Sequence, residues 1–414
     1  MPRILHLVHV FPPESHGGTE MYVQALARAQ RAQGLDAVVA CGSERYQGAE
    51  PAREEQEGLP VFRLPMNGHL RDADWSCSET TAQLRAVMAE SRPDLVHVHH
   101  WHNLSTDVVR AAAATGVPVV VTLSDFFSCC PLFFRLPDDV TPCPPDLDPE
   151  VCVRCLASAY VAPEPMVRAA FPRRETQLRE ELAAAGAVTV LSRAQLDYMR
   201  AMPIFDGVPL QVLSYPSPVL GEPAAAASPR TGDVDLRLVS WGGLVPGKGF
   251  GVLVEACERL RAPDRIELHH FGTVLDEDYR DRVIALGPRS KPTLHGRFGR
   301  EELMTLFPSY DLAVFPSFYM ETHGLVVDEA IQLGLPVIVS DRGAPPERVG
   351  AHGLTFPAGD VGALADALQR IIDDSTVLET FRNAPLPAPY SMERHLDDLD
   401  EVYRAVSGAG RTGG

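Results

Sequence analysis

Residues 315–341, FPSFYMETHGLVVDEAIQLGLPVIVSD, predict a loop and a helix that follow a strand. The apolar run Leu312–Phe315 is typical of a buried strand, and Pro316-Ser317 ends it. Apolar residues then recur at helical spacing from Leu325 to Ile331, until Gly334-Leu335-Pro336 stops the helix. The stretch is therefore a strand, loop, helix unit.

Two carboxylates in this unit are predicted to face one site. Glu321 falls in the loop, and Glu329 lies one to two turns into the helix, on the side that points back to the same cleft. Gly324 leaves the amides of the helix N-terminus uncovered, which suits a phosphate. Carboxylates that bind hydroxyl groups, beside amides that bind phosphate, predict a nucleotide-sugar site. We place its contacts at His323, Gly324, Leu325 and Glu329. The alternative is an ordinary solvated first turn, where the helix dipole favours acidic residues.

Length and charge narrow the class of protein. A chain of 414 residues suggests two domains, and a net charge of −18 argues against a nucleic-acid partner. Residues 1–10 lack the longer apolar region of a signal peptide, so we expect a cytoplasmic protein. Four arginines would allow peripheral contact with the inner membrane, although a solvated helix face explains them as well. They are Arg168, Arg173, Arg174 and Arg179.

Short apolar runs alternate with helical patterns along both halves of the chain. This alternation predicts parallel strands with crossover helices, which form open doubly wound sheets. The first series has strands at 4–10, 37–40, 95–99, 117–123 and 187–191, with helices at 21–33, 106–114 and 194–201. The second has strands at 236–240, 266–271, 312–315 and 337–340, with helices at 250–260 and 364–372.

The series define two Rossmann-like domains, 1–215 and 235–388, with ligand at the carboxyl ends of the strands. A stretch rich in proline and small residues, 216–234, is the predicted linker. A cysteine-rich insertion, 126–165, interrupts the first domain, and 389–414 forms a last helix, 392–406, and a flexible tail.

Glycine loops follow a strand in each domain. Gly17-Gly18 opens the first helix, so its bare backbone can approach a phosphate or an acceptor group closely. In the second domain, Gly242 and Gly247-Lys248 have the spacing of the P-loop of an NTPase. Gly249 stands where that motif needs a Ser or Thr to hold magnesium, which argues against an NTPase.

The segment Glu321–Glu329 resembles the Glu, seven residues, Glu motif of retaining glycosyltransferases with the GT-B fold, in particular family 4. The resemblance covers nearly the whole chain and implies two Rossmann-like domains facing a cleft, with a C-terminal helix that crosses back to the first domain. It implies that Glu321 contacts the donor sugar, that Glu329 contacts the ribose, and that Gly17 and Gly18 face the donor diphosphate.

The loop after Trp241 resembles the family's Gly-Arg-Leu, Pro, Lys-Gly element, whose Arg and Lys neutralise the diphosphate leaving group. Lys248 occupies the Lys position, whereas Gly243 stands at the Arg position. Either Arg297 or Arg342 compensates for the missing cation, or activity falls below the norm of the family.

The strand that ends at Leu123 resembles the family's apolar strand followed by His-Asp, yet Ser124 replaces that His. Asp125 remains a candidate catalytic contact, and we expect Ser124, His99 and His102 on the acceptor side. A metal site among the histidines is disfavoured, because alternate strand residues point to opposite faces and only pairs could share an ion. The cluster consists of His97, His99, His100 and His102.

The resemblance implies retaining transfer from a UDP- or GDP-linked sugar to a glycan, lipid-linked or small-molecule acceptor, without a catalytic cofactor. Glu321, Lys248 and Asp125 are the predicted catalytic residues. An epimerase of the same fold and a non-catalytic carbohydrate-binding relative are the alternatives. A dinucleotide oxidoreductase is disfavoured because neither glycine loop has its Gly-x-Gly-x-x-Gly turn.

Four cysteines in the insertion predict a structural metal site. Cys130, Cys143, Cys152 and Cys155 lie in a proline-rich segment that we expect to lack a core of its own, and four thiolates binding zinc would order it. An iron–sulfur cluster and free thiols are the alternatives, and Cys129 could replace Cys130. A subset of family 4 sequences carries a similar insertion, and we infer that it shapes the acceptor side.

Overall fold

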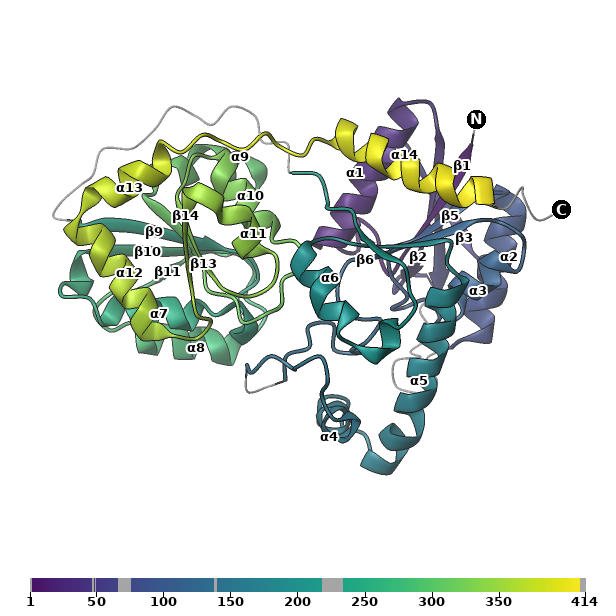
Figure 1. Ribbon diagram of the computed structural model, residues 1–414, viewed down its shortest axis with the longest axis horizontal. Coiled ribbons are helices and arrows are strands. Elements are labelled where there is room, and N and C mark those ends of the chain that lie inside the picture. The colour runs from purple at the N-terminus through teal and green to yellow at the C-terminus, as the bar shows by residue number, and fades with distance from the viewer. Residues whose placement is uncertain are drawn as a thin grey trace. The chain divides into compact units, whose positions relative to one another are not determined.

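The computed structural model describes residues 2–46, 48, 50–65, 76–137, 140–217 and 234–409, and the chain divides into two compact units. Both units are α/β with a parallel sheet, which confirms the expected fold class (Figure 1). Unit 1 comprises Met1–Arg135, Cys143–Pro216 and Tyr390–Gly414, and unit 2 comprises Leu136–Pro142 and Ser217–Pro389. Residues 218–233 of the predicted linker and 410–414 of the predicted tail lie outside the described residues.

The sheet of unit 1 has eight strands in the order β3-β4-β2-β1-β5-β6-β7-β8. All neighbours are parallel except β3 and β4, which pair antiparallel. The central strands are buried and mostly apolar because helices cover parallel sheets on both faces. The strands are β1 (Arg3–Val8), β2 (Asp36–Ser43), β3 (Ala52–Gln56), β4 (Leu59–Pro65), β5 (Leu95–Val98), β6 (Val119–Leu123), β7 (Ala187–Val190) and β8 (Leu210–Val212).

The last helix of the chain, α14 (Met392–Ala409), belongs to unit 1, which confirms the predicted return to the first domain. Its apolar residues recur at helical spacing and join the core around α1 and β1 (Figure 1). Those residues are Leu396, Leu399, Val402, Tyr403 and Val406. The other helices of unit 1 are α1 (Gly18–Ala32), α2 (Ser78–Ser91), α3 (Val108–Ala113), α4 (Pro149–Ala159), α5 (Glu164–Ala184), α6 (Arg193–Arg200) and the 3₁₀ turn η2 (Pro203–Phe205).

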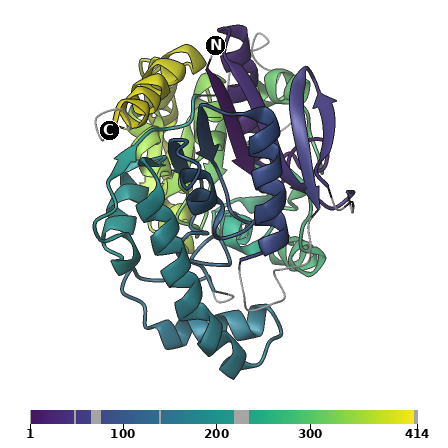
Figure 2. The same cartoon turned by 90° about the vertical axis from the view of Figure 1, so that its right-hand side faces the viewer.

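The insertion, 126–165, contributes to a small apolar core that it shares with the part of α5 beyond it. Figures 1 and 2 show α5 extending beyond the sheet, with α4 at its far end. Val153, Leu156 and Ala157 of α4 pack against Val167 and Phe171 of α5. The helical spacing of the α4 residues places them on one apolar face of the helix. Packing of this face against α5 orders part of the insertion without a metal.

The predicted basic surface on α5 is reduced by burial and pairing. Arg174 is fully buried, with its guanidinium 4.7 Å from the centroid of the Phe127 ring. Arg168 forms ion pairs with Glu150 and Glu164. Arg173 and Arg179 remain exposed on α5. No helix in the described part of the chain is long and apolar enough to cross a membrane.

The sheet of unit 2 has six parallel strands in the order β11-β10-β9-β12-β13-β14. The strands are β9 (Leu236–Trp241), β10 (Ile266–Phe271), β11 (Thr293–Leu294), β12 (Leu312–Phe315), β13 (Val337–Ser340) and β14 (Gly353–Phe356). The helices are α7 (Phe250–Glu258), α8 (Glu277–Leu286), α9 (Arg300–Thr305), α10 (Leu325–Gln332), α11 (Pro345–Val349), α12 (Val361–Asp373) and α13 (Ser375–Arg382). The 3₁₀ turns are η3 (Pro246–Lys248), η4 (Pro263–Arg265), η5 (Phe307–Ser309) and η6 (Gly350–His352).

Candidate active site

Two loops at the carboxyl edge of the unit 2 sheet are fastened to each other. The first follows β9 and the second follows β12, its neighbour in the sheet. The Phe318 amide donates to the Gly247 carbonyl at 2.8 Å. Gly249 has φ +73°, and a Cβ there would lie 1.9 Å from the Pro316 carbonyl oxygen, so only glycine permits this approach. The contact places the η3 turn against the second loop.

The approach of the loops brings together Lys248 and Glu321. Lys248 Nζ lies 2.6 Å from Glu321 Oε1, and the same oxygen accepts a hydrogen bond of 2.9 Å from Ser317 Oγ. Lys248 Nζ also lies 5.5 Å from the centroid of the Tyr319 ring. The two side chains are 38% and 21% exposed, so both remain open to a ligand. A cation and a carboxylate are therefore held side by side at the end of the sheet.

Glu329 lies on α10, and its Oε2 accepts a hydrogen bond of 2.7 Å from the indole nitrogen of Trp241. Burial raises the pKa of Glu329 to about 7, and the Trp241 bond offsets only part of this effect. Gly324 caps α10 at φ +82°, a conformation that leaves Leu325 at the first helical position. Sequence reasoning missed Trp241, whose pairing with Glu329 depends on β9 lying beside β12.

His323 is buried in a polar network rather than presented at the surface. Arg348 on α11 donates to the His323 carbonyl at 2.7 Å, and its Nη2 lies 2.6 Å from the His323 Nδ1. Arg348 also donates to both carboxylate oxygens of Asp328, at 2.8 and 2.7 Å. Burial lowers the pKa of His323 to about 4. Sequence reasoning missed Arg348, which braces the loop that carries Glu321.

Gly243 and the two candidate substitute cations follow strands at this same edge. A Cβ on Gly243 would lie 2.9 Å from Cδ1 of Leu275, the flexible end of an exposed side chain. Arg297 Nε donates to Thr273 Oγ1 at 3.2 Å. Arg342 follows β13, and the amide of Ala344, two residues on, donates to the Glu321 carbonyl at 2.8 Å. The segment that carries Arg342 is therefore hydrogen-bonded to the backbone of Glu321, which favours Arg342 as the substitute cation.

In unit 1, Gly17 and Gly18 form the start of α1, as predicted. The Glu20 side chain folds back against them. A Cβ on Gly17 would lie only 2.6 Å from Glu20 Oε2. Ser15 Oγ donates to Glu20 Oε1 at 2.5 Å, and His9 Nε2 lies 3.4 Å from the same oxygen. Glu20 and His9 were missed, although an acidic residue in a first helical turn is the signal that could have found Glu20.

Asp125 lies at the carboxyl edge of the unit 1 sheet. It accepts hydrogen bonds from His100 Nε2 at 3.0 Å and from the Phe127 amide at 2.7 Å. The amide of His102 donates to Nδ1 of His100 at 2.9 Å, which orients the imidazole toward Asp125. Ser124 Oγ is 2.5 Å from Tyr215 Oη and is buried. Asp125 and His102 therefore remain accessible parts of this edge, whereas Ser124 is turned inward.

His99 does not lie on an accessible acceptor side, contrary to the expectation. Its side chain is 1% exposed, and its Nε2 lies 3.0 Å from Nδ1 of His6. The ring packs on that of His97 with 4.0 Å between centroids. His99 is interior because it points to the same side of the sheet as His97, two residues earlier.

The four cysteines of the insertion are half-buried, and Cys152 lies near the other three. Burial raises the pKa of Cys152 to about 12, and the thiols of Cys130, Cys143 and Cys155 add to this rise. Within the described ranges, however, the only three metal-ligating atoms all within 4.8 Å of one another belong to histidines. The four predicted cysteine ligands thus lie in one region, but no three of their sulfur atoms are all within 4.8 Å of one another. Cys129 is buried and donates to the Phe126 carbonyl.

Comparison with known proteins connects both units to one group. Residues 17–216 match the description "Glycosyl transferase 4-like domain", and residues 235–374 match "Glycosyl transferases group 1". The chain is 28% identical over 385 residues to the MMP alpha-(1->4)-mannosyltransferase of Mycolicibacterium hassiacum, covering 86% of each chain. It is 26% identical over 399 residues to the glycogen synthase of Mycobacterium tuberculosis, covering 90% of this chain and 86% of that one.

Solved structures share the architecture. Sucrose-phosphate synthase from Thermosynechococcus elongatus is similar at a TM-score of 0.73 and 19% identity, covering 99% of this chain and 100% of that one. Anabaena HepE in complex with UDP-glucose is similar at a TM-score of 0.65 and 18% identity, covering 97% and 99%. At these identities the likeness establishes the fold.

Proposed function

Because the chain belongs to glycosyltransferase family 4 and is a transferase with a nucleotide-sugar donor, we propose that it transfers a hexose with retention of anomeric configuration. The donor is a UDP- or GDP-linked sugar, and the acceptor is a hydroxyl group of a glycan, a lipid-linked sugar or a small molecule. The observation that carries the proposal is the Lys248–Glu321 pair, held at the carboxyl edge of the unit 2 sheet beside Glu329 and Trp241.

The proposed reaction is a displacement on the face of the leaving group. The acceptor oxygen forms a bond to the anomeric carbon as the bond to the diphosphate breaks, and the leaving diphosphate oxygen takes the hydroxyl proton. Lys248, the Gly18 amide and the amides that follow Gly324 stabilise the charge that develops on the diphosphate. Asp125 is the proposed contact on the acceptor side. The protein acts by positioning and electrostatics.

Donor binding would rearrange the Lys248–Glu321 pair. The diphosphate carries more negative charge than one carboxylate, so it competes for Lys248. Glu321 is then free to accept hydrogen bonds from hydroxyl groups of the sugar. Ser317, which already donates to Glu321 at 2.9 Å, keeps the carboxylate in place during the exchange. Without donor, the Glu321 carboxylate thus takes the place beside Lys248 that the diphosphate would occupy.

Thermal shift against UDP-glucose, GDP-mannose and the free diphosphates tests donor choice. A bound donor raises the melting temperature according to its concentration relative to its Kd. We expect one nucleotide series to stabilise the protein and the other to leave it unchanged. Equal shifts with both series, or none with either, would contradict a specific donor site.

Nucleotide diphosphate binding should strengthen between pH 6 and pH 8. Burial raises the pKa of Glu329 to about 7, and ribose hydroxyls donate best to the charged carboxylate. Glu329→Gln should remove this pH dependence and weaken binding at pH 8 by about 1 to 3 kcal/mol. Calorimetry at several pH values measures both effects. Affinity of the wild type that does not change with pH would count against the ribose contact.

The same variant gives a second, ligand-free result. The folded pKa of Glu329 lies above its ordinary value of 4.5, so the folded state binds more protons than the unfolded state between these two values. Glu329 therefore destabilises the fold increasingly as the pH rises from 4.5 through 7. The melting temperature of Glu329→Gln relative to the wild type should rise over that interval.

Restoring the family's arginine should increase activity. In Gly243→Arg the nearest obstacle is the flexible end of Leu275, so the side chain can extend without backbone strain. A second cation at the diphosphate contributes one charge-assisted bond, and we expect turnover to rise about tenfold. Gly243→Gln is the uncharged control. If Arg342 already fills the role, Arg342→Ala lowers turnover by a similar factor and Gly243→Arg rescues it.

We propose that Cys130, Cys143, Cys152 and Cys155 bind one structural zinc ion or an iron–sulfur cluster. Support comes from the proximity of Cys152 to the other three thiols and from the Cys-x-x-Cys pair on α4. Protein purified without chelator should carry one zinc, or the corresponding iron, at this site, and Cys152→Ser should lose it. Cys257→Ser, which changes a buried core thiol, is the control. Metal content of Cys152→Ser equal to that of the wild type would contradict this site.

A further inference from the structure

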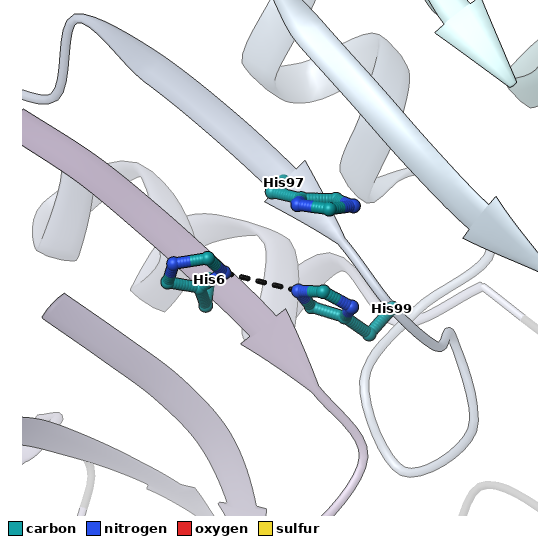
Figure 3. A group of neighbouring side chains, drawn as sticks. All are labelled: His6, His97 and His99. Atoms are coloured by element: carbon teal, nitrogen blue, oxygen red, sulfur yellow. Dashed lines mark hydrogen bonds between the residues drawn. The ribbon is translucent and has the colours of Figure 1, made fainter. Parts of the chain in front are cut away.

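Three buried histidines from two neighbouring strands converge in the core of unit 1 (Figure 3). His6 on β1 is the register partner of His97 on β5, and His99 follows two residues later on the same side. One ring nitrogen from each residue lies within 4.8 Å of the others. Alternation along β5 allows only two histidines on one side, and β1 supplies the third.

Neighbouring side chains hold the ring of His6 in one orientation. His6 Nε2 lies 2.7 Å from the Gln30 oxygen, so it carries the hydrogen and leaves the lone pair on Nδ1. That lone pair faces Nε2 of His99 at 3.0 Å, as the dashed line of Figure 3 shows. Gln30 donates its amide nitrogen to Tyr403 Oη at 3.4 Å, which fixes its oxygen on His6.

His97 is held in the same manner. Its Nε2 lies 2.7 Å from Thr122 Oγ1, and its Nδ1 lies 2.8 Å from Tyr403 Oη. A histidine ligand whose second nitrogen donates to a protein oxygen is the usual arrangement around protein-bound metals. Gln30 and Thr122 provide this arrangement for two of the three rings.

We propose that His6, His97 and His99 form a binding site for a transition-metal ion of the zinc class, with Tyr403 Oη as the fourth ligand. Imidazole nitrogen suits zinc, copper, nickel and iron. Four ligands at about 2.0–2.1 Å from zinc lie roughly 3.4 Å apart, so the 3.0 Å gap between His6 and His99 needs to open by only a few tenths of an ångström.

The protons balance without a charged ring. Burial lowers the pKa of all three histidines. The hydrogen between His6 and His99 moves to Nδ1 of His99, a buried atom without a hydrogen-bond partner among the described residues. Burial raises the pKa of the Tyr403 hydroxyl, so the ion has to displace this proton, and the resulting phenolate offsets one of the two positive charges.

A cavity of about 910 Å³ in unit 1 is lined by neighbours of the histidines, although not by the three rings themselves. Its walls include Gln30 and Tyr403, the residues bonded to His6 and His97, together with Ile4, Leu95 and Leu399. Because Tyr403 and Leu399 belong to α14, ligation would fasten this helix to β1 and β5.

Cobalt(II) titration of chelator-treated Cys152→Ser protein tests the proposal without interference from the thiolates. We expect one cobalt per chain, visible absorption without a thiolate charge-transfer band, and a higher melting temperature. His99→Gln should lose all three signals, and His295→Gln in unit 2 should keep them. Circular dichroism and nucleotide diphosphate binding report whether His99→Gln is folded.

A milder variant covers the case in which His99→Gln does not fold. Thr122→Val keeps the shape of the core and removes the bond to Nε2 of His97, so cobalt affinity should fall about 10- to 100-fold. Absence of stoichiometric cobalt in the Cys152→Ser protein, or unchanged affinity in Thr122→Val, would overturn the site and make the cluster a hydrogen-bonded core. Both outcomes are independent of glycosyl transfer.

Discussion

Glu321→Gln is expected to lower turnover about 100- to 1,000-fold while nucleotide diphosphate affinity stays within about twofold. The variant keeps the length of the side chain and its bond from Ser317, but it loses the charge that we assign to the sugar. Lys248, freed from its 2.6 Å partner, remains available to the diphosphate. Single-turnover kinetics and calorimetry with the free diphosphate separate the two effects.

A matched control for Glu321→Gln is Glu379→Gln, which changes an exposed glutamate on α13 of the same unit. Stability should change little in either variant, because partly exposed ion pairs contribute at most about 1 kcal/mol. Equal loss of donor and diphosphate binding in Glu321→Gln would mean that the sugar has been placed wrongly.

Lys248→Met is expected to reduce turnover by a similar factor, about 100- to 1,000-fold, with a smaller change in KM. The diphosphate gains charge as the glycosidic bond breaks, so the ammonium group stabilises the transition state more than the bound donor. Initial rates at several donor concentrations measure kcat and KM separately. Lys248→Arg should recover part of the loss because it returns the charge.

A Lys248→Met variant whose turnover equals that of the wild type would remove Lys248 from the mechanism.

The central strands were predictable because apolar runs such as Ile4–Val8 and Leu312–Phe315 are buried on both faces. The β3–β4 hairpin was missed because Arg53, Glu54 and Glu55 give β3 the composition of a loop. An edge strand in contact with solvent can carry such charges. Its signal was Glu57-Gly58, two residues with positive φ that make a tight hairpin turn.

The individual residues of the site were predictable from the sequence, but the contacts between them were not. Glu321, Lys248 and Glu329 each follow from local motifs and the family resemblance. Their partners depend on strand order, because Trp241 reaches Glu329 only when β9 lies beside β12. The histidine cluster was missed for the same reason, since β1 supplies the third ring.

Nuclear magnetic resonance of the transferred sugar tests the central claim most directly. The enzyme is incubated with the α-linked nucleotide hexose that stabilises it and with a panel of hydroxyl acceptors, and the configuration of the new anomeric centre is determined before it can equilibrate. Retaining transfer predicts release of one nucleotide diphosphate for each α-linked product. A β-linked product, or a donor recovered as an epimerised nucleotide sugar, would contradict it.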